Sequence, residues 1–369
     1  MKKNEIAVIY GKEYKNMTKE LLEFCRLEEM IPAKDVCIGI KPNLVSAVPA
    51  EEGATTHPEV IEGLILYLKE KGFTNLVILE GSWVGDQTSD AFAVCGYEAL
   101  SEKYQVPLWD MQKDKSIEKD CRGLKLHICE RVSKIDFLIN VPVLKGHCQT
   151  RMTCALKNMK GLIPNSEKRR FHRMGLHRPI GLLSSGIHQD FILVDSICGD
   201  LTFEDGGNPV EQNRLMAAVD PVLCDTFGCT LIGIHPQDVE YIAYAQQAGV
   251  GSNDLEQAQI HYLHKEEEMP YFHASGKALQ LAERVEEVES CSACYGYLIP
   301  ALHMLEEEGL LEQLKEKVCI GQGYRGKTGV LGIGNCTRKF THHLPGCPPT
   351  EMQIYEFLKE YLQSGEAGE

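Results

Sequence analysis

The segment Ile135–Gly161, which reads IDFLINVPVLKGHCQTRMTCALKNMKG, decides the fold class. Residues 135–143 form an almost continuous apolar run without helical spacing, and such a run predicts a strand buried on both faces. Pro142 has no amide hydrogen to donate, so the hydrogen-bonded part of this strand should end just before it. Two basic side chains, Lys145 and His147, follow immediately. Because ligands of open α/β sheets bind at the carboxyl ends of strands, this junction predicts a site.

Strands and helices alternate along the first 250 residues. Alternation of this kind is typical of a parallel sheet covered on both faces. We therefore expect an α/β fold with a doubly wound, mostly parallel sheet, and a smaller C-terminal α/β domain that carries cysteines. Apolar runs predict further strands at residues 6–10, 36–40, 76–79, 106–109, 124–129, 191–194 and 215–219. Amphipathic or proline-capped segments predict helices at about residues 18–30, 58–71, 180–185 and 221–232, with another after Pro236.

The chain length of 369 residues exceeds that of a usual single domain. The sequence from about residue 265 to 290 is charged and irregular, and we place a domain boundary at residues 269–271. The expected domains are residues 1–270 and 271–369. In the second domain the patterns predict a helix over 303–317, strands over 318–320 and 330–333, and a last helix from about residue 350.

Charge and hydropathy restrict the classes of partner. The formal net charge of −15 argues against general nucleic-acid binding, which needs clustered lysine and arginine. The first residues, MKKNEIAVIYGKEY, lack the apolar core of a signal peptide, and no stretch of the sequence is long enough to cross a bilayer. We therefore expect a cytoplasmic protein that binds neither nucleic acid nor membrane.

One segment, residues 157–178, is basic within this acidic chain. It holds seven Lys or Arg and a single acid, Glu167, so its net charge is 7 − 1 = +6. A basic island on an acidic protein suggests a site for a small anionic substrate or an acidic partner. A solvated charged surface is the alternative interpretation.

Polar side chains collect where the predicted strands end. A lysine beside a second cation has a lowered pKa and can serve as an acid, a base or an anion clamp. Histidine can transfer protons near neutral pH. The sequence holds no GxSxG elbow, HExxH helix or P-loop, which disfavours ordinary hydrolase and kinase chemistry. The candidate catalytic residues are Lys145, His147 and His172, and the candidate substrate-binding residues are Lys41, Asn43, Glu80, Lys157, Asn158 and Asp195.

Four of the fifteen cysteines form the strongest metal-binding pattern. Cys291 and Cys294 make a CxxC, and Cys336 and Cys347 lie farther along in glycine-flanked turns. A CxxC places two thiolates beside one ion or cluster, and two more cysteines complete a four-thiolate shell. Proline after Cys347 resembles the Cys-Pro ending of bacterial ferredoxin motifs. The pattern favours an iron–sulfur cluster of the [4Fe-4S] type, with zinc as the alternative, although zinc ribbons more often show two CxxC pairs.

A second glycine-rich pattern, Gly321–Gly326, fits the GxGxxG dinucleotide fingerprint and follows a predicted strand. The fingerprint requires a helix next, so that the pyrophosphate meets the helix N-terminus. Here another strand-like run follows, and we interpret the pattern as a glycine-rich turn.

Six separated motifs resemble those of one known family. They are KPNLVS, ATTHPEVI, ILEGS, INVPVLKGH, ALKNMKGLIP and AVDPVLCDTFGCTLIGI, and they occur in the family's order between about Ile38 and Gly251. The chain is thereby similar to the "domain of unknown function 362" family. Members of that family often carry ferredoxin-type cysteine motifs, so the resemblance implies an iron–sulfur protein. In this chain the four cysteines are spread through a C-terminal segment instead of being packed as CxxCxxCxxxC.

These features together predict an oxygen-sensitive iron–sulfur oxidoreductase or electron-transfer protein. The cluster would pass electrons to a small anionic substrate held in the large domain, and a ferredoxin-like or flavin-containing donor would supply them. Two alternatives stay open. One is a zinc-stabilised binding or scaffold protein without turnover, and the other is a redox-neutral isomerase or lyase that uses Lys145 and His147.

Overall fold

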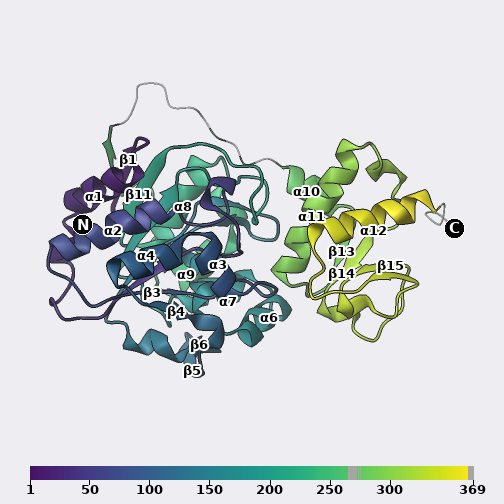
Figure 1. Cartoon of the computed structure of the whole chain (residues 1–369), viewed down its shortest axis with the longest axis horizontal. Helices are drawn as coiled ribbons and strands as arrows, with labels where there is room; N and C mark the ends of the chain where they lie inside the picture. Colours follow the sequence, from purple (N-terminus) through teal and green to yellow (C-terminus); the bar gives the residue numbers. More distant parts are fainter. Residues whose placement is uncertain (265–271, 273, 275, 365–369) are drawn as a thin grey trace.

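Two β-sheets, each with its own helices, organise the chain in the computed structural model. The structure describes residues 1–264, 272, 274 and 276–364. An eight-stranded sheet lies within residues 5–263, and a four-stranded sheet lies within residues 285–344. Figure 1 shows these two units side by side along the long axis of the molecule. The domain boundary expected at residues 269–271 lies outside the described residues.

The large sheet is almost entirely parallel. Neighbouring strands run in the same direction except where β11 pairs with β10 and β1, to both of which it is antiparallel. The predicted α/β fold with a mostly parallel sheet is therefore confirmed. From edge to edge the strands are β12 (Gln259–Leu263), β1 (Glu5–Tyr10), β11 (Arg214–Ala218), β10 (Phe191–Ser196), β7 (Phe137–Val141), β2 (Ile38–Pro42), β3 (Leu76–Glu80) and β4 (Leu108–Asp110).

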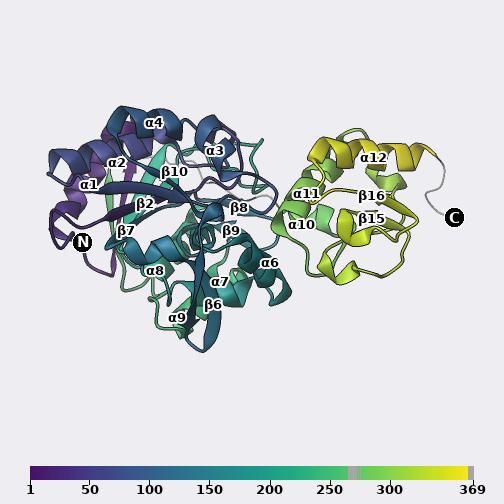
Figure 2. The same ribbon diagram turned by 60° about the horizontal axis from the view of Figure 1, so that its bottom comes forward.

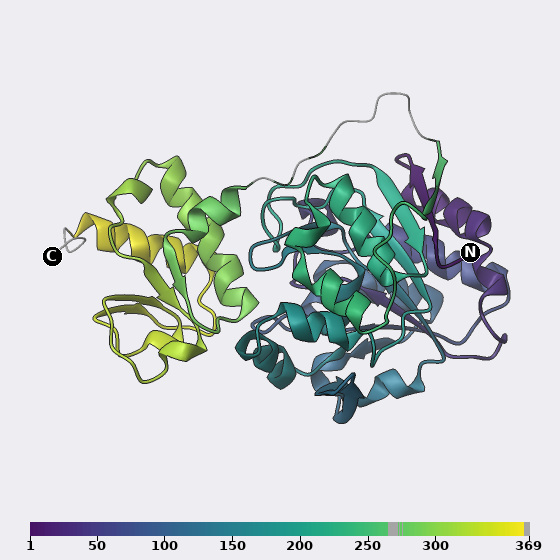
Figure 3. The same cartoon turned by 180° about the vertical axis from the view of Figure 1, so that it is seen from behind.

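Helices cover both faces of this sheet, as Figure 2 and Figure 3 show from two sides. Leu193 packs in the core beneath α1 to α4, while its neighbour Val194 packs in the core beneath α5 to α9. Adjacent residues of a strand thus point to different apolar cores, which is the reason that the strands read as continuous apolar runs. The helices are α1 (Tyr14–Cys25), α2 (Pro58–Glu70), α3 (Thr88–Val94), α4 (Tyr97–Tyr104), α5 (Ala155–Asn158), α6 (Asn165–Arg173), α7 (His177–Leu183), α8 (Pro221–Leu231) and α9 (Glu240–Gln247).

The hairpin of β8 (Lys145–His147) and β9 (Arg151–Thr153) links the sheet to the C-terminal unit. It follows β7 directly, because Pro142 ends that strand as the sequence predicted. In the turn of the hairpin, Gln149 donates from Nε2 to Glu287 Oε1 at 2.7 Å. The residues after β7 thereby lie between the two units.

Shorter elements complete both units and their connections. None of the described helices is both long enough and apolar enough to cross a membrane. The remaining elements are a hairpin of β5 (Ser116–Cys121) and β6 (Leu124–Cys129), and 3-10 turns η1 (Leu27–Glu29), η2 (Ala50–Glu52), η3 (Met111–Lys113), η4 (Glu130–Lys134), η5 (Met159–Leu162), η6 (Pro236–Asp238), η7 (Leu311–Gln313), η8 (Gln322–Tyr324) and η9 (Asn335–Thr337).

The C-terminal unit is a parallel four-stranded sheet packed against three helices. Buried side chains such as Leu302, Ile320 and Leu358 give it a hydrophobic core of its own. Its strands, in spatial order, are β13 (Val285–Glu287), β14 (Val318–Ile320), β15 (Leu331–Ile333) and β16 (His342–Leu344). Its helices are α10 (Lys277–Ala282), α11 (Ser292–Glu307) and α12 (Glu351–Gln363).

The helix predicted over residues 303–317 is wrong in its position. Helix α11 begins at Ser292, directly after the first cysteine of the CxxC. Gly296 and Pro300 lie inside it, and both residue types disfavour helix in an isolated sequence. In the fold Gly296 is useful, because a Cβ there would meet the ring of Trp83 at 3.0 Å. Tertiary packing between the two units therefore outweighs the local propensity.

Candidate functional site

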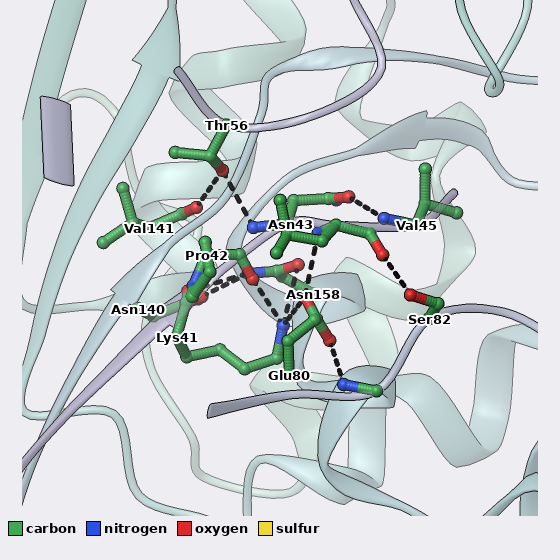
Figure 4. Close-up of polar contacts among 12 residues, drawn as sticks. Lys41, Pro42, Asn43, Val45, Thr56, Glu80, Ser82, Asn140, Val141 and Asn158 are labelled. Atoms are coloured by element: carbon green, nitrogen blue, oxygen red, sulfur yellow. Dashed lines mark hydrogen bonds and ion pairs between the residues drawn. The ribbon is translucent and has the colours of Figure 1, made fainter. Parts of the chain in front are cut away.

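Three strand ends meet in a buried polar network, drawn in Figure 4. Lys41, in β2, donates from Nζ to Glu80 Oε2 at 2.7 Å, to the Pro42 carbonyl at 2.7 Å and to Asn158 Oδ1 at 3.3 Å. The Lys41 side chain is 0% exposed. Burial lowers the pKa of Lys41, although the Glu80 carboxylate opposes this shift. Because each charge is deprived of water, each depends on the other for compensation.

Glu80 also orders the loops around it. Its two carboxylate oxygens accept hydrogen bonds from the backbone amides of residues 44 and 81, at 3.0 and 2.7 Å. Asn158 Nδ2 donates to Asn140 Oδ1 at 2.7 Å and so connects α5 to β7. A Cβ on Gly161 would lie 1.9 Å from Glu80 Oε1, so this close approach requires glycine. The sequence-predicted residues of β2, β3 and α5 are thus brought together, as a rigid floor.

A cavity lies beside this floor, between the two units. The volume within it that the centre of a water-sized sphere can occupy is ≈ 80 Å³. The N-terminal unit contributes most of its lining, including Asn43 and Asn158, and the C-terminal unit contributes residues 291–293. The ionisable side chains of the N-terminal unit that line it are Glu80, Lys145, Lys157, Lys160, Lys168, His172 and Glu204.

Two of the cavity lysines are bound to backbone carbonyls. Lys145 donates from Nζ to the carbonyls of Ala54, at 2.7 Å, and of Glu204. Lys168 donates to the carbonyls of residues 81 and 82 at 2.9 and 2.6 Å. Burial lowers the pKa of each of these lysines to about 8. Their ammonium groups hold the loops at the cavity in place.

The other two lysines have few protein partners. Lys157 donates to Thr153 Oγ1 at 3.2 Å, and Lys160 makes no hydrogen bond or ion pair with any described residue. Burial lowers the pKa of Lys160 to about 8, opposed by the negative charges of Glu204 and of the Cys291 thiolate. Burial also lowers the pKa of Lys157, and neighbouring Lys160 adds to this effect. Two lysines that face one cavity and share no acceptor beyond the Thr153 hydroxyl form a ready site for an anion.

His147 and Glu204 form a buried pair at the edge of the cavity. The His147 Nε2 atom contacts Glu204 Oε2. His147 Nδ1 accepts hydrogen bonds from the amides of Gln149, at 3.0 Å, and Thr150, at 3.2 Å. A ring nitrogen that accepts is unprotonated, so the Nε2 proton is the one directed to Glu204. Burial lowers the pKa of His147 to about 3, and this histidine is therefore neutral at physiological pH.

His172 joins the two units instead of standing free in the cavity. Its Nε2 accepts from the Ser292 amide at 3.2 Å. Burial lowers the pKa of His172 far below its usual value, with a further contribution from Lys160. The ring is thus neutral, with its proton on Nδ1, and this buried atom has no hydrogen-bond partner among the described residues.

Asp195 lies outside the cavity, although we predicted it for the same site. Its Oδ2 contacts His57 Nδ1 at 2.8 Å and accepts from the His57 amide at 2.8 Å. Glu204, Lys160 and Lys168 are cavity residues that the strand-end argument missed. The two lysines lie in the basic island, which was a signal for them, whereas Glu204 lies in a glycine-rich loop with no pattern that distinguishes it.

Of the four predicted metal ligands, Cys291 lines the cavity, and all four belong to the C-terminal unit. Cys291 precedes the first turn of α11, Cys294 lies within that turn, Cys336 lies in η9, and Cys347 follows β16. Burial raises the pKa of Cys294, and the charges of the other three thiolates raise it further. These four sulfurs are therefore close enough to interact.

The spacing of the sulfurs disfavours a single tetrahedral ion. Zinc with Zn–S bonds of about 2.3 Å places its sulfurs about 3.8 Å apart. No three of the four sulfurs lie within 4.8 Å of one another. A cluster of several metal atoms needs a wider shell than one ion. Donors to sulfur are present, since Gln322 Nε2 lies 3.8 Å from Cys291 Sγ, and a hydrogen bond to Cys336 raises the pKa of Arg325.

A different trio has the tighter spacing. Cys154, Cys224 and Asp225 place one ligand atom each within 4.8 Å of the others, and all three are buried in the core. The Asp225 carboxylate accepts from the amides of Ala155, at 2.7 Å, and Leu156, at 3.2 Å, at the start of α5. The oxygens of Asp225 are thus used to cap a helix.

A family model described as "Domain of unknown function (DUF362)" matches residues 38–230. The chain belongs to the DUF362 family. This confirms the resemblance found in the six motifs. The DUF362 match contains every cavity residue of the N-terminal unit from Asn43 to Glu204, whereas the four cysteines lie beyond it.

Two further similarities accompany the DUF362 match. A thylakoid-associated protein from Synechocystis sp. is 23% identical over 235 residues, which are 59% of this chain and 69% of that protein. The lactate racemase apoprotein from Thermoanaerobacterium thermosaccharolyticum aligns with a TM-score of 0.42 and 17% identity, over 60% of this chain. The alignment spans 56% of the racemase chain.

Proposed function

We propose that this protein is an iron–sulfur oxidoreductase that reduces or oxidises a small anion in the cavity between its two units. One observation carries the proposal: Cys291 lines the same cavity as Lys157 and Lys160. The lysines and the first of the four cysteines, which lie more than 100 residues apart in the sequence, thus border one space. Substrate and electron source would be adjacent there.

The anion would bind through Lys157 and Lys160. Their ammonium groups face the cavity, while those of Lys145 and Lys168 are bound to carbonyls. One water needs about 10–15 Å³ on this measure of volume, so ≈ 80 Å³ fits several waters or a ligand of a few heavy atoms. A carboxylate or phosphate-sized anion matches both the charge and the room.

The cluster would be held by Cys291, Cys294, Cys336 and Cys347. A cluster held by these residues would supply single electrons to a substrate in the cavity. Lys160 would connect the anion site with the cluster site, because its ammonium group interacts electrostatically with both Glu204 and Cys291. The proposal includes a cytoplasmic location and a ferredoxin-like or flavin-containing electron donor.

The geometry gives less support to the two alternatives. Lys145 has its ammonium group bound to two carbonyls, and His147 directs its proton to Glu204. Neither presents a free group for the proton transfers of an isomerase or lyase. A zinc scaffold needs the four sulfurs nearer together than the structure has them.

Anaerobic purification tests the proposal. We expect about four iron and four sulfide per chain, with visible absorption that bleaches when dithionite is added. Stoichiometric zinc without iron would instead establish the scaffold function. Protein with neither metal, whose activity on a carboxylate is unaffected by chelators, would support the redox-neutral enzyme.

A further inference from the structure

A thiol, an imidazole and a carboxylate contact one another in sequence at a second place, outside the cavity. Cys198 Sγ is 3.5 Å from His57 Nε2, and His57 Nδ1 is 2.8 Å from Asp195 Oδ2. The arrangement brings together the end of β10, the start of α2 and the loop after β10. A thiol within reach of an imidazole that a carboxylate orients is the general signature of an activated nucleophile.

The imidazole in this line carries a positive charge. Burial disfavours that charge, but Asp195 outweighs burial and raises the pKa of His57 to about 11. Asp195 itself is fixed by the amide of Ile197, which donates to Oδ1 at 3.0 Å. The Nε2 atom of this imidazole faces the Cys198 sulfur, so a proton donor lies beside the atom that would react.

One layer of chain separates this thiol from solvent. Cys198 is 7% exposed, and its sulfur lies 3.4 Å from the carbonyl of Ala50 in η2. The next residue, Glu51, is exposed, as the opposite side of the same turn faces water. On the other flank the ring of Tyr14 packs edge-on against His57, with centroids 5.5 Å apart. Access of a small reagent to the sulfur would require η2 to open locally.

The same region offers a matched thiol without an imidazole. Cys95 is 4% exposed and lies 3.1 Å from the carbonyl of Val48 and 3.7 Å from Thr55 Oγ1. Its burial and its carbonyl contact are like those of Cys198. The His57–Asp195 pair is the difference between the two sites.

We propose that Cys198 is a reactive thiol that hydrogen peroxide oxidises to a sulfenic acid. The Cys198 thiolate attacks one oxygen of the peroxide, so an S–O bond forms and the O–O bond breaks. His57 gives its Nε2 proton to the departing hydroxide, which leaves as water, and the neutral ring regains a proton from solvent. Sulfur loses two electrons and the peroxide gains them. This site is independent of the function proposed for the cavity.

Competition between the two thiols in one molecule tests this proposal. Folded protein is treated with hydrogen peroxide and dimedone, which traps sulfenic acid, and separately with iodoacetamide under anaerobic conditions. Peptide mass spectrometry then follows both cysteines over time. We expect Cys198 to react at least tenfold faster than Cys95 with each reagent. Equal rates would overturn the proposal.

The variant His57→Gln removes the cation and keeps the size of the side chain similar. We expect the rate at Cys198 to fall to that of Cys95, while the rate at Cys95 is unchanged. Faster labelling of Cys95 would reveal a loosened fold. In that case the proposal is judged only by the ratio of the Cys198 and Cys95 rates in the wild-type protein. An unchanged ratio in a variant whose Cys95 stays protected would show that the imidazole does not activate Cys198, and would overturn the proposal.

Discussion

At the scale of single residues, Lys160 is the cavity lysine that an anionic ligand can bind without breaking a hydrogen bond within the protein. Its ammonium group makes no hydrogen bond to any described residue, and burial already disfavours its charged form. Lys160→Met should therefore lower the affinity for an anion such as oxalate by about ten- to hundredfold, the worth of one charge-assisted hydrogen bond. Calorimetric titration measures this change. The matched control is Lys125→Met, an exposed lysine paired with Glu118, which should leave affinity unchanged.

Stability provides a second readout for the same substitution. Lys160→Met should keep or raise the melting temperature, since it removes a half-buried charge without an acceptor. Lys168→Met should lower it, because two carbonyls lose their donor. If oxalate binds Lys160→Met and wild-type protein equally well, the anion site is wrongly placed.

The pH dependence of anion binding follows from the same residue. The pKa of Lys160 is lowered to about 8, so the ammonium form is complete below that pH and is lost above it. Affinity for oxalate should thus fall by about tenfold between pH 7 and pH 9, as the cation titrates. Titrations over this range check the prediction, and the slope should be smaller in Lys160→Met. Affinity that rises with pH would contradict it.

In the ion pair of Lys41 and Glu80, removing one charge should destabilise the fold because it leaves the other charge buried and unpaired. Lys41→Met leaves a buried carboxylate without its cation, and such a change costs about 3–5 kcal/mol. Glu80→Gln in the same chain should recover much of that loss, because the amide oxygen can still accept from a backbone amide. Urea unfolding of the two single variants and the double variant measures the coupling. A cost below about 1 kcal/mol for Lys41→Met would show that the pair is not buried in solution.

At the scale of secondary-structure elements, the start of α11 explains the place of the metal ligands. Cys291 immediately precedes the first turn of α11 and Cys294 lies within it, where free amides and the helix dipole favour negative charge. Changing any one of Cys291, Cys294, Cys336 or Cys347 to Ser should lower iron content at least twofold and bleach the visible absorption. Cys319→Ser is the matched control, because Cys319 lies in β14 beside the carbonyl of Lys317. Equal iron loss in the control would refute the assignment.

The sequence predicted elements well where one periodicity dominates. Strands such as β7 and β14 are apolar runs ended by proline or glycine, and helix α2 begins at Pro58 as its capping pattern indicates. The antiparallel direction of β11 was not predictable, because direction depends on the path of the loop over residues 197–213 and not on strand composition. The three-residue strands β13 and β16 are too short to show alternation.

The candidate site was predictable in part, and for a clear reason. Parallel strands bring their carboxyl ends to one edge, so Lys41, Glu80 and Lys145 could be grouped from sequence. Which lysine ammonium is free and which is bound to a carbonyl depends on loops that pattern does not describe. Asp195 lies at the same edge but faces His57. Cys291 lies beside this edge because the two units pack against each other. The sequence of neither unit indicates how they pack.

At the scale of the whole molecule, the cavity exists only while the two units stay together. Gln149 connects them, since its Nε2 donates to Glu287 Oε1 at 2.7 Å and its Oε1 accepts from Ser292 Oγ at 3.0 Å. Nε2 also donates to Ser290 Oγ at 3.4 Å, so Gln149→Ala removes three hydrogen bonds between the units, and it touches neither the cavity lysines nor the cysteines. We expect oxalate affinity to fall by about three- to tenfold, as these hydrogen bonds between the units are lost, while iron content stays at the wild-type value.

Hydrogen exchange and small-angle scattering can locate the effect of Gln149→Ala. The amides of β8, β9 and the start of α11 should exchange faster, and the radius of gyration should increase, because contacts between the units normally hold both together. The matched control is Gln313→Ala, in the exposed turn η7 of the C-terminal unit, which should change none of these quantities. Loss of affinity without faster exchange would mean that Gln149 acts on the ligand by another route. Unchanged affinity with faster exchange would mean that the N-terminal unit alone completes the anion site, and that the cysteines border it without shaping it.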